Sequence, residues 1–458
     1  MTNQMTLLKN KNVLIIGMGK SGEAAMDLAL ASGAQVHIQD SKTEDQMDEE
    51  LMRKIRQGGV RAWLGRIPED MGIYDMLVLS PGVPVDLPFI LDAKAGEAEI
   101  IGELELAYRI GNGHYVAITG TNGKTTTTTL VGEIYKAAGK ETYVVGNIGV
   151  PVIKGARQAS SEGWLITEVS SFQLETTDEF RPEVSALLNL TPDHLNRHKT
   201  MENYGAAKAR IFMRQSADQY CVVNADDPLC YALTEGCPAT VVPFSRKKEL
   251  DFGAFVKGEE IVIRGSEGEE HAICGTEELL IPGTHNLENA LAAAAISYFG
   301  GIQPKVIGDV MRTFAGVEHR IENAGEYGGV RFVNDSKGTN PDAAIKAVEA
   351  MKENIILLAG GYDKKSDFTE FIRVCKGRVK KLVLLGATAE QIRQTALKEG
   401  FENIVICPDM EACVAEAVRS AVPGDVVLLS PACASWDMYD NFEQRGEHFK
   451  TCVRQLHP

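Results

Sequence analysis

The sequence predicts an α/β protein of three domains built around parallel sheets. Short apolar segments alternate with amphipathic helical segments along the whole chain, which is typical of βα units. The chain has 458 residues, more than one hydrophobic core usually organises. A Gly-Asn-Gly step at 111–113 and a change of pattern near residue 317 divide it. We therefore expect domains at residues 1–110, 111–317 and 318–458.

The composition excludes several classes of protein. No apolar run approaches the ~18 residues that a membrane span requires, and the first residues lack the apolar core of a signal peptide. The nine cysteines include no CxxC pair, which favours reduced thiols over disulfides or zinc. A net charge of −16 argues against a nucleic-acid partner, which would require a basic face. We expect a cytoplasmic monomer with neither a membrane nor a nucleic-acid partner.

The first domain begins with a strand and a glycine-rich turn. Strands are expected at 12–17, 35–40, 61–64 and 76–80. Residues 17–22 read GMGKSG and Asp40 ends the second strand, which fits a dinucleotide-binding fingerprint. A lone GxGxxG is a weak signal, because the same loop can hold any pyrophosphate. A nicotinamide-dependent dehydrogenase and a non-enzymatic nucleotide switch therefore stay open at this point.

The second domain carries the strongest motif. Strands are expected at 114–119, 143–145, 164–167, 184–188 and 220–223, followed by a β-rich stretch at roughly 240–282. The segment ITGTNGKTT, residues 118–126, lies between an apolar strand and a helix. Its glycines let backbone N–H groups face one anion, Lys124 can reach the β- and γ-phosphates, and Thr125 can bind Mg²⁺. Ile118 departs from the standard pattern, which has glycine there. The segment predicts a nucleoside triphosphate site.

Two further polar residues follow strands of the same predicted sheet. Glu168 comes as the strand at 164–167 ends, and His194 follows the strand at 184–188. Carboxyl ends of parallel strands meet at one edge of a sheet, so both residues are expected near Thr125. Each residue alone is more often structural. Together with the loop they indicate an Mg²⁺ cluster.

Lys208 is unusual because it falls on the apolar face of a predicted helix. The helix is expected at 201–214, where Tyr204, Ile211 and Phe212 form the apolar stripe. Pattern alone favours a lysine whose stem is buried and whose amine reaches solvent. The alternative is carbamylation by CO₂, which would turn the cation into an anionic metal ligand.

The third domain places polar residues after its own strands. Strands are expected at 330–334, 355–359, 382–385, 404–407 and 426–430. The segment DSKGTN, residues 335–340, follows the first of them and precedes a proline that can open a helix. Lys364 and Ser435 lie in loops after later strands, where open α/β sheets bind ligands. Lys365 adjoins Lys364, so which lysine serves stays open.

These motifs together resemble the Mur ligase family. The resemblance spans the chain and rests on Lys208, on His319-Arg320, and on the segments GMGKSG (17–22), SPGVP (80–84), GTNGKTTT (120–127), EVSSFQLE (168–175), PGTHNLEN (282–289), NDSKGTNP (334–341) and SPACASWDMYDNFEQRG (430–446). It implies a Rossmann-like N-terminal domain, a central P-loop-type ATPase domain whose parallel sheet has a small β-rich part, and a Rossmann-like C-terminal domain.

The resemblance also implies an activity. It is that of an ATP-dependent ligase that joins UDP-N-acetylmuramoyl-L-alanine to D-glutamate through an acyl phosphate and releases ADP and phosphate, in cytoplasmic peptidoglycan precursor synthesis. The nearest alternative is another Mur-type or folylpolyglutamate-type ligase that uses a different amino acid or acceptor. The implied cofactors are ATP and two Mg²⁺ ions, together with a CO₂-derived carbamate on Lys208.

The resemblance assigns roles to individual residues. The UDP-linked substrate would meet Lys20, Ser21, Asp40, Ser41 and Gly82, with Asn147 and Ser170 on its muramoyl-alanine side. ATP would meet Gly120, Thr121, Asn122, Gly123, Lys124, Thr125, Thr126, Asn286, Asn289, Arg320 and Asp335. Metal ligands would be Thr125, Glu168, His194 and carbamylated Lys208. The amino acid would meet Thr339, Lys364, Ser435 and Phe442. Catalytic roles would fall to Lys124, Glu168, His194, Lys208 and Lys337.

Overall fold

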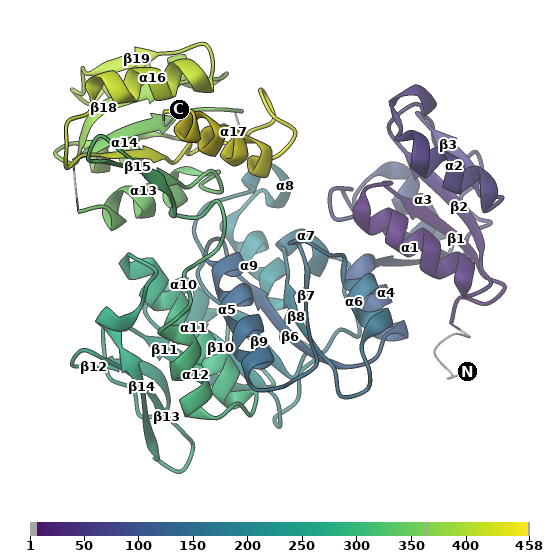
Figure 1. The fold of residues 1–458 in the computed structure, drawn as a ribbon. Coiled ribbons are helices and arrows are strands. Elements are labelled where there is room, and N and C mark those ends of the chain that lie inside the picture. The colour runs from purple at the N-terminus through teal and green to yellow at the C-terminus, as the bar shows by residue number, and fades with distance from the viewer. Residues whose placement is uncertain (1–6, 353, 363–364, 457–458) are drawn as a thin grey trace. The chain divides into compact units, whose positions relative to one another are not determined.

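The computed structural model describes residues 7–352, 354–362 and 365–456. The chain forms two compact units. The first extends to Thr276 and includes Glu288–Arg312, and the second consists of Glu277–Leu287 and the chain from Thr313 onward. The first unit holds two sheets and the second holds one (Figure 1). The α/β architecture is confirmed, whereas the three domain boundaries stay predictions.

The sheet nearest the N-terminus has five parallel strands in the order β3-β2-β1-β4-β5. Its elements are β1 (Asn12–Ile16), α1 (Lys20–Ala31), β2 (Gln35–Asp40), α2 (Glu49–Gln57), β3 (Arg61–Leu64), β4 (Met76–Leu79), α3 (Pro88–Ala95), β5 (Glu99–Gly102) and α4 (Glu103–Ile110). Val13 and Ile15 pack in one apolar cluster, whereas Leu14 and Ile16 pack in another. Both faces of this sheet are therefore buried, as parallel sheets require.

The second sheet has nine strands in the order β14-β13-β12-β11-β10-β9-β6-β8-β7. The strands are β6 (His114–Thr119), β7 (Thr142–Gly146), β8 (Trp164–Glu168), β9 (Val184–Leu187), β10 (Tyr220–Asn224), β11 (Thr240–Ser245), β12 (Gly253–Lys257), β13 (Glu260–Arg264) and β14 (Glu270–Gly275). Pairing is parallel from β7 to β12 and antiparallel from β12 to β14. The predicted β-rich stretch thus continues the central sheet instead of forming a separate part.

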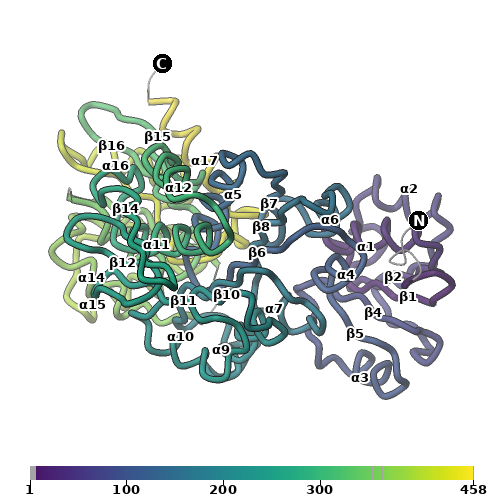
Figure 2. Tube along the Cα trace, turned by 90° about the horizontal axis from the view of Figure 1, so that it is seen from below, coloured from purple at the N-terminus to yellow at the C-terminus, as the bar shows by residue number. Residues whose placement is uncertain are grey.

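Helices connect many of these strands, and two more follow the last strand of the sheet. They are α5 (Lys124–Ala137), α6 (Val152–Gln158), α7 (Ser171–Leu174), α8 (Leu195–His198), α9 (Met201–Ala209), α10 (Pro228–Ala232), α11 (Thr284–Phe299) and α12 (Pro304–Met311). Helix α5 packs beside β7 and β8 (Figure 2). Helix α9 ends at Ala209, so the prediction of a helix to residue 214 was wrong at its end. Ile211 and Phe212 are buried in the turns that follow.

The sheet of the second unit has six strands in the order β15-β16-β20-β17-β18-β19. Its elements are β15 (Glu322–Tyr327), β16 (Val330–Asn334), α13 (Pro341–Ala350), β17 (Ile355–Ala359), α14 (Thr369–Cys375), β18 (Val379–Leu384), α15 (Ala389–Lys398), β19 (Ile404–Ile406), α16 (Met410–Ser420), β20 (Val426–Leu429) and α17 (Phe442–Arg454). Only β15 pairs antiparallel among these described strands. Residues of α13, α14 and α15 cover one face of this sheet, and residues of α16 and α17 cover the other.

Among the residues described, the helices are all too short or too polar to cross a membrane.

A buried carboxylate fixes α4 within the first unit. Glu105 is fully buried and accepts backbone N–H bonds from Asp178 at 2.9 Å, Glu179 at 2.9 Å and Phe180 at 3.2 Å. The guanidinium of Arg109, one helical turn further on, donates to it at 2.7 Å. The carboxylate therefore joins α4 to the segment that leads into β9, the strand beside the glycine-rich loop.

Replacing Glu105 with alanine should destabilise the protein by about 3–5 kcal/mol, because Arg109 and three backbone donors would lose a buried acceptor. Urea denaturation followed by circular dichroism measures this loss. As a control, Glu133→Ala removes an exposed ion pair with Lys136 and should change the free energy of unfolding by less than about 0.5 kcal/mol. Equal effects of the two substitutions would contradict the role given to Glu105.

Candidate active site

The glycine loop, defined here as residues 120–124, turns sharply between β6 and α5. Gly120 has φ 155° and Gly123 has φ 84°, and residues that carry a side chain rarely adopt these backbone angles. Gly123 occupies the N-cap of α5 and has no side chain with which to cap that helix. Ile118 is fully buried within β6. The departure from the standard pattern thus reflects a strand that continues past the usual glycine position and a turn that begins at Gly120.

An asparagine that the sequence analysis did not single out holds this loop from the neighbouring strand. Asn189 accepts a bond from the Asn122 N–H at 2.8 Å and donates to the Asn122 carbonyl at 3.0 Å. Its own carbonyl accepts the Thr121 N–H at 3.0 Å. The signal available in the sequence was its position directly after the strand that became β9. The loop therefore has a fixed shape, with the Lys124 amine turned back onto the Gly120 and Thr121 carbonyls at 3.0 and 2.8 Å.

Glu168 lies beside the glycine loop, as the sequence predicts. It ends β8, is 1% exposed, and accepts the Thr125 hydroxyl at 2.8 Å and the Asn147 amide at 2.9 Å. Asn289 also lies close to the glycine loop, because its Oδ1 is 2.2 Å from the place that a Cβ on Gly123 would occupy. A side chain on Gly123 would therefore displace Asn289. Hard oxygen donors such as Glu168 and Thr125 are ligands that Mg²⁺ prefers.

Lys208 is buried at the same loop and is only 1% exposed. Its amine donates to the Gly120 carbonyl at 2.8 Å and lies 3.4 Å from the Thr119 hydroxyl and 4.6 Å from the centre of the Tyr204 ring. Burial, and after it the nearby Lys124 cation, hold the pKa of Lys208 well below its ordinary value. The buried position excludes the lysine with a solvated amine that the pattern favoured. An uncharged amine is the form that reacts with CO₂.

His194 has a left-handed backbone, with φ 54°, and leads into the short helix α8. Its ring packs edge-on against Phe172 with 4.8 Å between centroids, and Nε2 lies 3.5 Å from the Asp193 carboxylate. A second histidine, His198, was missed by the sequence analysis. It is buried, stacks on Phe172, and its Nε2 lies 2.9 Å from the Ser171 hydroxyl. Burial lowers the pKa of His198. No sequence signal distinguished it from a core histidine.

The first sheet carries a cavity of about 610 Å³ at the carboxyl ends of its strands. Among the predicted substrate residues, Asp40, Ser41 and Gly82 line it, whereas Lys20 and Ser21 begin α1 outside this lining. Asp40 accepts the backbone N–H of Met18 at 2.7 Å and that of Lys42 at 2.9 Å, one on each oxygen. This acid therefore holds the fingerprint loop in shape.

The cavity also has walls that the sequence analysis did not name. Arg66, which follows β3, lines it and stacks 5.0 Å from the centre of the Trp63 ring, while Leu87 and Phe89 supply apolar surface. The position of Arg66 at the carboxyl end of a parallel strand was the available signal.

Two residues that follow strands of the central sheet were predicted to meet the muramoyl-alanine side of the substrate. Asn147 binds Glu168, and Ser170 caps α7 by accepting the Gln173 N–H at 3.2 Å.

In the second unit, Asp335 follows β16 and is buried beside Arg320. Its carboxylate accepts the Ser430 hydroxyl at 2.7 Å and the Ile321 N–H at 3.3 Å. Burial raises the pKa of Asp335 to about 6, against the opposing effect of the Arg320 guanidinium. The Nε of Arg320 is buried and has no hydrogen-bond acceptor among the described residues. A buried N–H group without an acceptor can donate a hydrogen bond to an anionic ligand.

A buried arginine organises the other loops of the second unit. Arg445 of α17 is 2% exposed and donates to the Ser336 hydroxyl at 3.0 Å, the Ser336 carbonyl at 2.7 Å and the Cys433 carbonyl at 3.1 Å. It thereby joins the segment after β16 to the segment after β20. Sequence analysis missed it, although it lies in the long motif at 430–446. Burial lowers the pKa of Arg445 to about 10.

The residues predicted to bind the amino acid lie in the loops after β16, β17 and β20 and at the start of α17. The Lys337 amine lies 4.8 Å from the centre of the Phe442 ring, and Ser435 is buried in the loop after β20. Thr339 is half-buried two residues after Lys337. Lys364 lies outside the described residues, and Lys365 is exposed with φ 60°. Asn286, in the first turn of α11, donates to the Pro282 carbonyl at 2.7 Å.

Comparison with known protein families covers nearly the whole chain. The Mur ligase MurD-like N-terminal domain matches residues 11–102, the Mur ligase middle domain matches residues 118–297, and the Mur ligase glutamate ligase domain matches residues 319–433. These are the regions that carry the cavity of the first sheet, the glycine loop and Asp335.

Curated relatives are similar over their full length. A UDP-N-acetylmuramoylalanine–D-glutamate ligase of Alkaliphilus metalliredigens is 50% identical over 452 residues, which is 98% of this chain and 99% of the relative. Enzymes of the same name from Thermoanaerobacter sp. strain X514 and Clostridioides difficile strain 630 are each 48% identical, over 98% of this chain and 99% of the relative.

Solved structures share the fold. The UDP-N-acetylmuramate-alanine ligase MurC from Thermotoga maritima has a TM-score of 0.60 and 19% identity, over 97% of this chain and 100% of that chain. The MurF ligase from Thermotoga maritima, solved in complex with ADP, has a TM-score of 0.60 and 17% identity, over 99% of this chain and 100% of that chain. At these identities the likeness concerns the fold alone.

The raised pKa of Asp335 makes a prediction about stability. A pKa that rises from 3.8 to about 6 on folding means that the folded protein holds this proton more tightly. The contribution of Asp335 to stability is then fully present below pH 4 and is lost as the pH rises through 6, a change of about 3 kcal/mol. Asp335→Asn should therefore match wild type below pH 4 and be the more stable protein above pH 6. Urea denaturation across this range measures the difference, and a difference independent of pH would contradict the assignment.

Proposed function

This chain belongs to the Mur ligase family, and we propose that it forms the amide bond between UDP-N-acetylmuramoyl-L-alanine and D-glutamate at the cost of ATP. The observation that carries the proposal is the group of side chains around Gly120, where Lys124, Thr125, Glu168 and Lys208 gather at one glycine loop. Full-length likeness to D-glutamate ligases supports the choice of substrates. The fingerprint in the first sheet then serves a sugar nucleotide and not a nicotinamide cofactor.

The three predicted domains divide the work in this proposal. Residues 1–110 bind the UDP-linked substrate in the cavity beside Asp40, Ser41 and Gly82. Residues 111–317 bind ATP at the glycine loop, with Asn286 and Asn289 at the adenine nucleotide. Residues 318–458 bind D-glutamate, with Thr339, Ser435, Phe442 and one of Lys364 and Lys365 as its contacts. Both UDP precursors and ATP are cytoplasmic metabolites, so we place the reaction in the cytoplasm.

The reaction requires activation of a carboxylate, which otherwise has no adequate leaving group. In-line transfer of the γ-phosphoryl group to an oxygen of the alanyl carboxylate gives an acyl phosphate and ADP. The amine of D-glutamate, after losing a proton, attacks the acyl carbon and forms a tetrahedral oxyanion. The oxyanion collapses, the C–O bond to phosphate breaks, and phosphate leaves with the electron pair. The nitrogen loses its second proton to solvent, which gives the neutral amide. Phosphoryl transfer of this kind depends on positioning and on neutralising charge.

The residues of the chain supply that positioning. The N-terminus of α5 would face the phosphates, and Lys124 would turn from the Gly120 and Thr121 carbonyls to the transferred group. Arg320 supplies a buried N–H without an acceptor in the described part of the chain, and its positive charge acts on the nearby Asp335 carboxyl. Lys337 would assist the phosphate or the oxyanion.

The metal and the carbamate fit the residues present. Thr125 and Glu168 offer oxygen donors that lie 2.8 Å apart, and His194 and carbamylated Lys208 would hold a second ion. Mg²⁺, when bound, would offset charge on the phosphates. The depressed pKa of Lys208 supports the carbamate, because only the uncharged amine attacks CO₂ and burial favours the uncharged form of this amine. The product is an anion, which relieves the repulsion between Lys208 and Lys124.

The proposal predicts phosphate release that needs every substrate. Purified protein with ATP and Mg²⁺ should release phosphate only when UDP-N-acetylmuramoyl-L-alanine and D-glutamate are both present. A panel that includes L-glutamate and other amino acids, followed by mass spectrometry of the product, measures the choice of amino acid. Turnover with another amino acid in place of D-glutamate would favour a sibling ligase. Phosphate release that does not depend on the UDP substrate would exclude both the D-glutamate ligase and the sibling ligase.

The carbamate has a test of its own. Lys208→Ala should lower kcat by about 10²-fold or more, because the site loses an anionic ligand, while binding of the UDP substrate is unchanged. Wild-type protein in CO₂-depleted buffer should lose activity and regain it with bicarbonate, and carbon-13 bicarbonate should give a carbamate resonance. Lys136→Ala, on the exposed side of α5, is the control and should keep full activity. Retained activity of Lys208→Ala would contradict the proposed carbamate at this lysine.

A further inference from the structure

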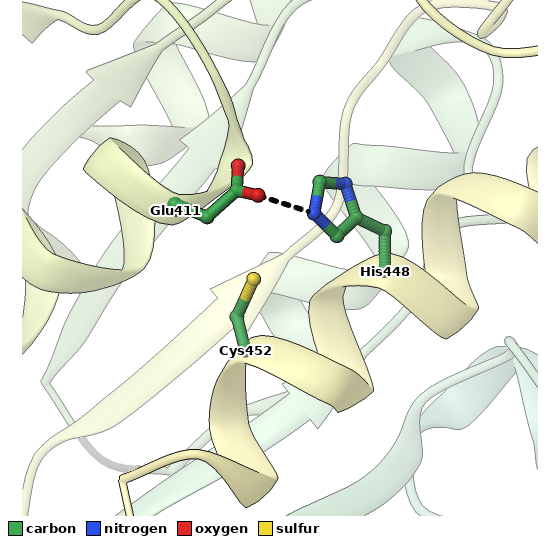
Figure 3. A group of neighbouring side chains, drawn as sticks. All are labelled: Glu411, His448 and Cys452. Atoms are coloured by element: carbon green, nitrogen blue, oxygen red, sulfur yellow. Dashed lines mark hydrogen bonds and ion pairs between the residues drawn. The ribbon is translucent and has the colours of Figure 1, made fainter.

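Three side chains of different chemistry meet between the last two helices of the second unit. Glu411 belongs to α16, and His448 and Cys452 belong to α17, four residues apart on one face of that helix (Figure 3). One ligand atom from each lies within 4.8 Å of the others. None of the three takes part in the proposed ligase reaction.

The imidazole of His448 is held at both nitrogens. Nδ1 lies 2.9 Å from the hydroxyl of Tyr439, and Nε2 lies 2.9 Å from a carboxylate oxygen of Glu411. An outer hydrogen bond at one nitrogen that fixes the ring, with the other nitrogen facing further donors, is the usual arrangement of a metal-binding histidine. Figure 3 shows the Cys452 thiol directed toward the space between the other two side chains.

The burial of the three groups is graded from outside to inside. The Glu411 side chain is 60% exposed, that of His448 is 32% exposed, and Cys452 is 5% exposed. An ion would therefore enter past an exposed carboxylate and reach a buried sulfur. The exposed carboxylate can also adjust its position at little cost, since tetrahedral ligands around Zn²⁺ lie about 3.3–3.8 Å apart by the usual bond lengths.

We propose that Glu411, His448 and Cys452 form a site for a thiophilic divalent cation, Zn²⁺, with water as the fourth ligand. Nitrogen, oxygen and sulfur together are the donors that zinc accepts and that Mg²⁺ does not. Binding releases the thiol proton of Cys452 to solvent, and the ring proton moves from Nε2 to Nδ1, which then donates a hydrogen bond to the oxygen of Tyr439. A carboxylate and a thiolate then balance the charge of the ion.

A comparison within the same unit shows why this cluster is preferred. Glu318, His319 and Glu447 also lie close enough to hold a metal. There, however, the ammonium of Lys450 already lies 2.6 Å from Glu447 and 3.1 Å from Glu322, and it also pairs with Glu318. A cation of the protein thus occupies that position, whereas the ring nitrogens of His448 contact a hydroxyl and a carboxylate.

The experiment is a metal titration of the full-length protein. Zn²⁺ is added in competition with a chromophoric chelator, and Co²⁺ is used as the spectroscopic probe. Wild type should bind one Zn²⁺, and Co²⁺ should give a thiolate-to-cobalt charge-transfer band together with the visible bands of a tetrahedral site. Zn²⁺ should also raise Tm, because it binds the folded state and links α16 to α17.

Three variants decide the result. Cys452→Ser should abolish the charge-transfer band, and His448→Gln, at a partly exposed position, should weaken Zn²⁺ binding by about tenfold or more. Cys237→Ser, which removes a half-buried thiol elsewhere, is the matched control and should bind as wild type does. Circular dichroism in chelator shows that each variant is folded. The proposal is overturned if His448→Gln binds Zn²⁺ as tightly as wild type, or if the cobalt band persists in Cys452→Ser. Because these readouts do not involve ATP, failure of the ligase proposal would leave them unchanged.

Discussion

The register of β6 between β8 and β9 is the constraint on which the central site depends. Parallel pairing sets Ile118 opposite Glu168 on one side and Thr119 opposite Leu187 on the other. The turn at Gly120 therefore begins where β8 presents its carboxylate and where the chain beyond β9 presents Asn189. A shift of one residue in the pairing of β6 with β8 would point Glu168 to the opposite face of the sheet. The apolar burial of these strands thus determines where the polar groups meet.

The buried guanidinium of Arg445 is held by neutral oxygen atoms. It donates to two carbonyls and a hydroxyl. In a chain of net charge −16, a carboxylate partner would cancel the positive potential at this position. Carbonyl oxygens satisfy the donors but leave much of that potential in place. Such an arrangement suits anionic substrates that must approach a protein whose overall field opposes them.

Sequence patterns predicted most of the strands, because a buried parallel strand is a short apolar run with clear ends. β5 and β15 were missed, since EIIG is short and ENAGEY has almost no apolar residue. The end of α9 at Ala209 was missed because Ile211 and Phe212 keep the helical spacing while packing in a turn. Glycine-loop residues and Glu168 were predictable from their places at strand ends. Asn189, His198 and Arg445 were not, because their roles arise from contacts between segments distant in sequence. The cluster at His448 escaped the search for CxxC pairs, since its ligands come from two helices.

Asp40 shows how one architecture can carry different chemistry. In dinucleotide-binding domains the acid at the end of the second strand accepts ribose hydroxyl groups. Here each oxygen of that acid already accepts a short backbone N–H bond, from Met18 on one side and Lys42 on the other. The carboxylate supports the turn from within, and the cavity beside it is lined also by Arg66, Leu87 and Phe89. An attempt to graft nicotinamide specificity onto this scaffold would first have to release that carboxylate and find another support for the turn.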